Sequence, residues 1–309
     1  IRTNKSTCTF KKNKKILTKM NRLSNKIRKL LREAYLLIFI HKFPKFFRFS
    51  SFPYLSGDTL RSLSDHIFDE TQSMNPKNVK INDFVFVKAD RLELYFSNIH
   101  KNIDNQYNLI THNSDRNIDE ETALLIDDNI LNWYAQNLIT AEKNNIKIIP
   151  IGLENKRFLN NGLVSHFKKY HNSEKSEYIL CSFNERSSER TSLNQLMKDN
   201  VNVVQKNFKN HKEYTKNLAK FKFNLCPNGN GVDTHRIWES FMVNTIPIVK
   251  NQTFVRNLIK NNVPLLVLEE WDELIDISKD ELDNIYIDLI EKRNNLNVND
   301  VDFWIKNII

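Results

Sequence analysis

Short runs of apolar and β-branched residues alternate with helix-length segments from residue 80 onward. Strands separated by single helices are typical of βαβ units, whose parallel strands are buried on both faces. The sequence therefore predicts an α/β protein with parallel sheets. The predicted strands are 84–87, 107–111, 146–151, 177–183, 201–204, 221–226, 246–249 and 264–268, and the predicted helices are 188–199, 211–220, 234–243 and 253–261.

One polar stretch with little strand character, residues 160–176, interrupts this alternation and is the best candidate for a linker. It separates a predicted N-terminal α/β domain, residues 51–160, from a predicted C-terminal α/β domain, residues 175–290. The tail, residues 291–309, contains Trp304 and several isoleucines. We expect this tail to pack back onto the body.

The net charge of the 309-residue chain is +9, but it is unevenly distributed. Residues 1–50 contain 15 Lys and Arg and one acid, Glu33, so they hold +14 and leave −5 for the remainder. Cations mixed with aromatic and aliphatic residues over 26–48 suit an amphipathic segment on an anionic membrane surface. A nucleic acid is the rival partner, and a basic helix packed on the body is the simplest alternative. The mildly acidic body argues against nucleic acid, because no basic stripe continues past residue 50.

The sequence also limits where the protein works. The longest apolar run in the basic arm, Ala34 to Ile40, has seven residues, whereas a spanning helix needs about 20. The three cysteines, Cys8, Cys181 and Cys226, are far apart and match neither a disulfide framework nor a zinc site. We therefore expect a protein without a transmembrane helix, either cytoplasmic or peripheral on a membrane.

The most informative stretch, residues 221–249, is predicted to form a strand, a glycine-containing turn, a helix and a second strand. Gly229 and Gly231 are expected to supply positive-φ positions and a close approach of backbone to a ligand. Asp233 or Thr234 is expected to cap the helix. Ligands of open α/β sheets bind outside the carboxyl ends of the strands, where a helix N-terminus suits phosphate.

Arg236 falls in the first turn of this helix, where a cation opposes the helix dipole. A nearby anion would remove that misfit, which favours a phosphate ligand. Glu239, three residues on, shares a helix face with Arg236. The alternative is an ordinary surface pair between these two side chains, because a lone Gly-x-Gly is a weak signal.

The run Phe-x-Leu-Cys-Pro-x-Gly-x-Gly-x-Asp-Thr-His-Arg-x-Trp-Glu, followed by Ile-Pro-Ile-Val, resembles the C-terminal signature of exostosin-like glycosyltransferases, including the ribitol-xylosyltransferase type. More distantly it is similar to α1,3-fucosyltransferases. The resemblance implies that Arg236 takes the place of the family's phosphate-binding Lys. His235 stands where that family has a Glu, so Glu239 becomes the expected ribose partner.

Upstream segments resemble the same group. They are 56–65, 109–115, 133–137 and 149–155, so that the resemblance covers roughly residues 52–270. It implies the GT-B fold, which has two Rossmann-type domains with parallel sheets facing a cleft. The nucleotide sugar is then expected in the C-terminal domain, and a glycan or glycoconjugate acceptor in the N-terminal domain.

Glycosyl transfer needs stabilisation of the diphosphate leaving group and a base for the acceptor hydroxyl. Arg236 and the helix N-terminus can supply the first without metal, and Arg186 and Arg190 follow a strand at the same edge. The one Asp-x-Asp match, Asp300 to Asp302, lies in the tail rather than at a strand end. We therefore expect no metal and no cofactor, with a UDP- or GDP-sugar as the co-substrate.

The predicted base is Asp115, which ends a strand-loop segment, with His112 as the second candidate because histidine suits proton transfer. Each has a plain structural alternative, a turn cap for Asp115 and a buried role for His112. Asp83, Asp90 and Glu93 stay open as further candidates. These residues and the resemblance together lead us to expect a metal-independent glycosyltransferase, and the resemblance alone implies that it is inverting. The alternative is a catalytically silent nucleotide- or sugar-binding module of the same fold.

Overall fold

The computed structural model describes residues 24, 27, 30, 31, 34, 48–306 without 144 and 160, and 308. The chain divides into two compact units, residues 1–48 and residues 49–309. In the first unit, the five described positions before Arg48 are helical. The predicted membrane contact over residues 26–48 therefore falls almost entirely outside the described residues. Among the described helices, none is both long and apolar enough to cross a membrane.

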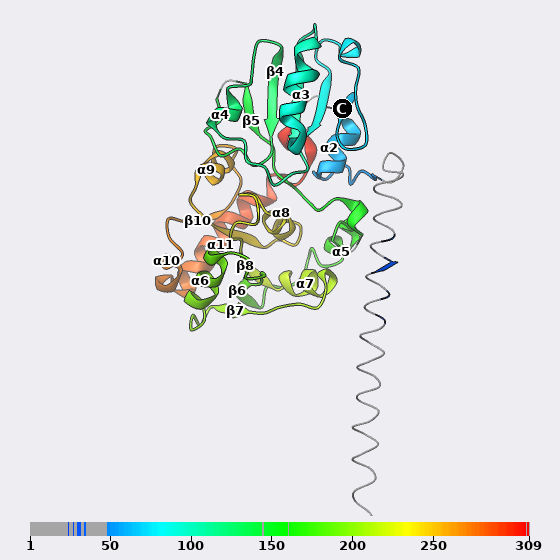
Figure 1. Cartoon of the computed structure of the whole chain (residues 1–309). Helices are drawn as coiled ribbons and strands as arrows, with labels where there is room; N and C mark the ends of the chain where they lie inside the picture. The colour runs from blue at the N-terminus through cyan, green and yellow to red at the C-terminus, as the bar shows by residue number, and fades with distance from the viewer. Residues whose placement is uncertain are drawn as a thin grey trace, which may run out of the picture. The chain divides into compact units, whose positions relative to one another are not determined.

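A first parallel sheet lies in the N-terminal part of the body, and its strands pair in the order in which they occur, β1-β2-β3-β4-β5 (Figure 1). The central strands are apolar on both faces because both faces are covered. We call the part of the body that carries this sheet the first domain. Its strands are β1 (His66–Phe68), β2 (Phe84–Lys88), β3 (Tyr107–His112), β4 (Ile130–Ala135) and β5 (Ile146–Ile148). Its helices are α2 (Gly57–Leu63), η2 (Pro76–Asn78), η3 (Ala89–Arg91), α3 (Leu92–Asn98), η4 (His100–Asn102), α4 (Glu120–Ala123) and η5 (Lys156–Phe158).

A second parallel sheet follows, and we call the part that carries it the second domain. Its strands are β6 (Glu177–Cys181), β7 (Val203–Gln205), β8 (Phe221–Leu225), β9 (Ile246–Lys250) and β10 (Leu266–Leu268). The helices from the linker onward are α5 (Val164–Lys168), α6 (Ser188–Leu196), α7 (His211–Leu218), α8 (His235–Phe241), α9 (Thr253–Lys260), α10 (Glu273–Asp276), α11 (Lys279–Asn294) and α12 (Val301–Trp304).

The strand order of the second sheet, β10-β9-β8-β6-β7, contains a reversal. The chain passes from β6 to β7 on one side and then crosses back to β8 on the other. The carboxyl ends of β6 and β8 therefore flank a topological switch point, which is where open α/β sheets bind ligands. Two parallel α/β sheets in succession confirm the predicted GT-B-type architecture.

The tail packs against the first domain. Val301, Ile305 and Ile308 are buried in one cluster with Leu55, Leu60, Phe86 and Ile110. The backbone adds two hydrogen bonds, from Leu55 N to Asn299 O at 2.7 Å and from Val301 N to Pro53 O at 3.0 Å. Trp304 also meets Trp238 of α8 edge to face, with ring centroids 5.8 Å apart. The chain thus ends on the domain where the body began.

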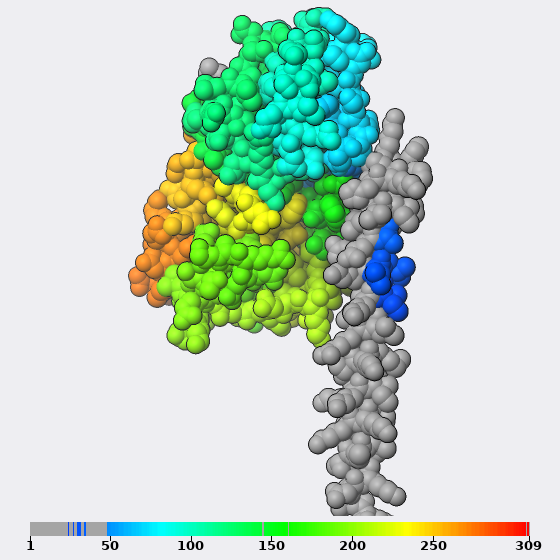
Figure 2. Space-filling view, viewed as in Figure 1, coloured from blue at the N-terminus to red at the C-terminus, as the bar shows by residue number. Residues whose placement is uncertain are grey.

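The loop between β8 and α8 connects the two domains through Asp233. Its Oδ2 accepts a hydrogen bond from the backbone N–H of Ile151 at 2.6 Å, and its Oδ1 accepts one from the indole N–H of Trp238 at 2.9 Å. Its own N–H donates to Asn137 Oδ1 at 3.1 Å. Burial raises the pKa of this carboxyl to about 6, against the lowering effect of the two N–H donors. The space-filling view shows this yellow segment adjoining the first domain (Figure 2).

The glycine pair in this loop does not have the backbone that the sequence predicted. Neither Gly229 nor Gly231 has a positive φ, so that prediction was wrong; the one glycine with a positive φ in the described chain is Gly152. Gly231 is needed for a different close approach. A Cβ there would lie 2.8 Å from Nδ2 and 2.9 Å from Oδ1 of Asn137, whereas a Cβ at Gly229 would meet nothing closer than 3.7 Å. Glycine is therefore required at position 231 for contact between the two domains rather than for contact with a ligand.

We therefore expect Gly231→Ala to lower the free energy of unfolding by about 1–3 kcal/mol, because the buried Asn137 is held by hydrogen bonds and cannot move aside. Gly229→Ala is the matched control and should change it by no more than about 0.5 kcal/mol. Urea unfolding of both variants measures the difference. Equal stability of the two variants would contradict the packing described for Asn137.

Asp233 generates a pH prediction. Its folded pKa of about 6 lies above its ordinary value of 3.8, so the folded state keeps a proton that the unfolded chain has released. The associated stability is fully present below pH 3.8 and is lost as the pH rises through 6. The amide that replaces the carboxyl in the D233N variant cannot titrate. We expect the stability advantage of the wild type over D233N to shrink by about 2–3 kcal/mol between pH 4 and pH 7, measured by urea unfolding. A pH-independent difference would contradict it.

Candidate functional site

A pocket of about 380 Å³ opens at the switch point, and we call it the switch-point pocket. Its walls come from the segments that follow β6, β7 and β8 and from the first turns of α7 and α8. This position agrees with the rule for open α/β sheets. The lining residues used below are Ser182, Asn184, Phe208, His211, Tyr214, Thr234, His235, Arg236, Glu239 and, from the first domain, Glu154.

Two arginines belong to this edge of the sheet. Arg236, in the first turn of α8, donates from Nε to the Ser182 carbonyl at 3.1 Å. Arg190, on α6 and 7% exposed, donates from Nε to Asn228 O at 2.8 Å and from Nη1 to Asn184 O at 3.3 Å. Within the described chain, neither guanidinium lies within 4.0 Å of a carboxylate oxygen. Burial, and then the charge of Arg236, lower the pKa of Arg190.

Two cations near each other, one buried and one half-buried, favour an anionic ligand when no carboxylate is paired with either. Arg190 also joins the two loops after β6 and β8, because its two hydrogen bonds end on carbonyls of both. The structure places Arg186 differently: it is exposed and does not line the pocket. The helix N-terminus is a minor contributor at most, since α8 has seven residues.

Glu239 is a carboxylate of the switch-point pocket and is 6% exposed. Its Oε1 lies 2.9 Å from Nε2 of His211. Burial raises its pKa, but the hydrogen bond and charge of His211 and the charges of His235 and Arg236 hold it below its ordinary value. Glu239 is therefore a buried anion beside His211, and the surface pair with Arg236 that was the alternative interpretation does not form. Sequence reasoning missed His211, although it begins a predicted helix.

Three of the predicted donor residues serve the loop itself. Gly231 and Asp233 make the contacts with the first domain described above, and Gly229 lies beside Arg190. Thr234 is the N-cap residue of α8, but its side chain makes no capping hydrogen bond, and it lines the pocket. Asp233 does not cap the helix, because both of its oxygens accept other hydrogen bonds.

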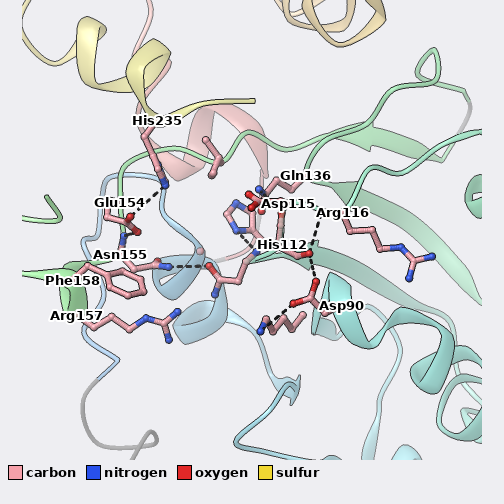
Figure 3. A pocket seen from close by; sticks show the side chains of 15 residues that line it. Asp90, His112, Asp115, Arg116, Gln136, Glu154, Asn155, Arg157, Phe158 and His235 are labelled. Carbon is pink, nitrogen blue, oxygen red and sulfur yellow. Dashed lines mark hydrogen bonds and ion pairs between the residues drawn. The ribbon is translucent and has the colours of Figure 1, made fainter. Parts of the chain in front are cut away.

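The first domain has its own pocket, of about 570 Å³, at the carboxyl ends of its strands (Figure 3). We call it the first-domain pocket. It begins at the ends of β2, β3 and β4 and continues along the segment after β5. Its titratable lining residues are Lys88, Asp90, His112, Asp115, Arg116, Glu154, Arg157 and His235.

The two predicted bases both line this pocket, in different ways. His112 is 1% exposed, and both of its ring nitrogens are engaged: Nε2 with Pro150 O at 2.9 Å and Nδ1 with the N–H of Asn113 at 2.8 Å. Burial lowers its pKa to about 4. Its geometry is that of a residue that fixes a loop. Asp115 is exposed, and its Oδ2 accepts a hydrogen bond from Asn230 Nδ2 at 3.1 Å.

The further candidates for the base are occupied or outside the pocket. Asp90 accepts a hydrogen bond from Ser114 and lies 3.1 Å from Lys88 Nζ. Asp83 pairs with His66 at 2.7 Å, and Glu93 pairs with Arg116; neither carboxylate lines the first-domain pocket.

The two pockets share two lining residues, Glu154 and His235. His235 is the first residue of α8, and its Nδ1 donates to Gly152 O at 2.7 Å. Its Nε2 lies 3.7 Å from Oε2 of Glu154 (Figure 3). Sequence reasoning quoted Glu154 in a resembling segment but gave it no role. Its position after a strand at the carboxyl edge of the sheet was the available signal.

Comparisons with known proteins agree with the motif. Residues 154–303 match the family model described as the RXYLT1 C-terminal domain. A solved structure described as "OtsA apo structure" is 8% identical over 79% of this chain and 73% of that chain, with a TM-score of 0.43. A TM-score this low does not by itself establish a shared fold. The comparison with curated proteins gives no match. Over residues 154–303, this chain is therefore similar to the C-terminal domain of the ribitol-xylosyltransferase type of exostosin-like glycosyltransferases.

Proposed function

We propose that this glycosyltransferase takes its sugar from a nucleoside-diphosphate donor held in the switch-point pocket and transfers it to an acceptor hydroxyl in the first-domain pocket. The observation that carries the proposal is the pair Arg190 and Arg236, two guanidiniums at a topological switch point with no carboxylate paired with them among the described residues. Arginine binds phosphate oxygens well because its planar N–H groups match them.

The remaining polar groups fit the rest of such a donor. Arg236 lines the pocket whereas the buried Arg190 stands behind it, so we assign Arg236 to the diphosphate directly. Glu239, held by His211, is suited to accept hydrogen bonds from ribose hydroxyls. Phe208 and Tyr214 line the same pocket and supply apolar area for a UDP or GDP base.

The proposal includes a metal-independent, inverting reaction. Two guanidiniums can balance the charge that develops on the leaving diphosphate, which is the task a metal has in other transferases. The Asp300–Asp302 pair lies at the start of α12, and neither pocket is lined by Asp302 or Asp300. Pockets that meet at one wall suit a single displacement, in which donor and acceptor react directly and the anomeric configuration inverts.

Nucleotide binding tests the donor site. Arg236→Ala should weaken UDP or GDP binding by about 10- to 100-fold in isothermal titration calorimetry, because it removes one charge-assisted hydrogen bond. Arg256→Ala, at an exposed arginine of α9 outside both pockets, is the matched control and should leave binding unchanged. EDTA should leave wild-type affinity unchanged. Unaltered binding by Arg236→Ala would refute the phosphate assignment, and loss of affinity in EDTA would refute metal independence.

We also propose that the basic arm contacts an anionic membrane through residues 26–48, a proposal supported by its charge and composition alone. Each Lys or Arg near such a surface contributes about 1 kcal/mol. Replacing Lys26, Arg28, Lys29 and Arg32 by Gln should therefore weaken sedimentation with phosphatidylserine vesicles at least ~10-fold. Binding to pure phosphatidylcholine vesicles should be weak for both chains. Equal binding of both chains to the anionic vesicles would refute the contact.

A further inference from the structure

We propose that Glu154 is the general base that takes the proton from the acceptor hydroxyl, and that His235 positions it. The inference rests on the proposed function and changes the assignment of the base made from the sequence. It starts from a geometric requirement. The reacting sugar carbon belongs to a donor in one pocket, and the attacking oxygen to an acceptor in the other, so the base must lie where the pockets meet.

Only Glu154 and His235 line both pockets among the described residues. They come from different domains, Glu154 from the segment after β5 and His235 from the start of α8. Their facing atoms, Glu154 Oε2 and His235 Nε2, are 3.7 Å apart (Figure 3). Both side chains are partly exposed, at 23% for Glu154 and 29% for His235. The pair is therefore open to a substrate from either side.

The two oxygens of Glu154 have different surroundings. Oε1 accepts a hydrogen bond from the N–H of Asn155 at 2.8 Å, which fixes the direction of the carboxylate. Oε2 accepts no hydrogen bond from the described residues and faces the shared wall. One oxygen thus anchors the group while the other is available to a hydroxyl, as a general base requires.

His235 is fixed from its other side. Because Nδ1 donates to the carbonyl of Gly152 at 2.7 Å, the ring presents Nε2 toward Glu154. With Nε2 3.7 Å from Oε2, the ring limits the directions in which the carboxylate can turn at the shared wall. We call His235 a positioning residue because it acts through Glu154.

The competing groups are less suited to this task. His112 has both ring nitrogens engaged. Asp90 is neutralised by Lys88. Asp115 lines the first-domain pocket but not the switch-point pocket, so it does not lie where the two pockets meet.

The step balances without a further reactant. The acceptor oxygen forms a bond to the anomeric carbon while its proton passes to Glu154 Oε2. The bond from that carbon to the diphosphate oxygen breaks, and the leaving nucleoside diphosphate keeps the electron pair. Arg236 and Arg190 offset the added negative charge. The same base can activate water, so hydrolysis of the donor reports on it.

The experiment measures UDP or GDP release from a panel of UDP- and GDP-sugars, with water as the acceptor, alongside UDP and GDP binding by calorimetry. Glu154→Gln should lower kcat by ~100-fold or more, the usual contribution of a general base, with nucleotide affinity and thermal unfolding unchanged. Glu291→Gln, at an exposed carboxylate of α11, is the matched control and should turn over like the wild type.

His235→Asn separates positioning from donor binding, because the amide can still donate to Gly152 O while Nε2 is lost. We expect kcat to fall by ~10-fold with little change in KM or nucleotide affinity, less than the full effect of losing the base. Loss of nucleotide affinity at unchanged kcat would instead place His235 on the donor and overturn its positioning role.

Several results would overturn the base assignment. One is a kcat of Glu154→Gln within about threefold of the wild type, because loss of a general base costs far more than that. Loss of turnover in Asp115→Asn alongside that result would assign the base to Asp115. Another is release of sugar with the donor's own anomeric configuration, read by NMR. A third is binding of UDP or GDP by a wild-type chain that turns over no donor. Failure to bind either nucleotide refutes the proposed function itself, which distinguishes the two failures.

Discussion

The loop between β8 and α8 is bound on both sides, and the arrangement of both pockets depends on it. The carboxylate of Asp233 joins the backbone of Ile151 in the first domain to the indole of Trp238 in the second. Gly231 allows Asn137 to approach closely, and His235 reaches the carbonyl of Gly152. These contacts fix the start of α8 against the segment after β5. They therefore set where Arg236 and Glu154 lie relative to each other.

The free-energy cost of fixing this loop between the domains comes mainly from the buried carboxyl group of Asp233. A carboxylate removed from water is stable only when hydrogen bonds replace its hydration, and Asp233 has two N–H donors for two oxygens. Burial nevertheless dominates, since its pKa is raised to about 6. A neutral side chain would avoid that cost, but it would offer fewer acceptor sites to the two donors. The carboxyl therefore fixes the geometry between the domains at a cost in local stability.

The sequence predicted the second sheet strand by strand because its strands are apolar runs bounded by turn residues. In the first sheet it missed β1, which has three residues, and β4, whose Asn132 interrupts the apolar run. Trp133 of β4 is a core residue, buried with its indole N–H donating to Thr111 Oγ1. The motif led to Arg236 and Glu239, and the position after β6 led to Arg190, since residues that follow parallel strands converge at one edge. It could not show that Asp233 and Gly231 face the other domain, because that depends on contacts distant in sequence.

The general base also depends on contacts between residues distant in sequence. The motif therefore identified only part of the site. From the sequence alone, the expected general base is a polar residue at the end of a strand, and Asp115 and His112 both meet that condition. What distinguishes Glu154 is a shared wall, which exists only once α8 of the second domain lies against the segment after β5. The charges then divide between the domains: guanidiniums for the leaving group come from the second, and the carboxylate for the acceptor comes from the first. His235 is the residue through which the two halves meet, so the reaction site is a property of the interface and of neither domain alone.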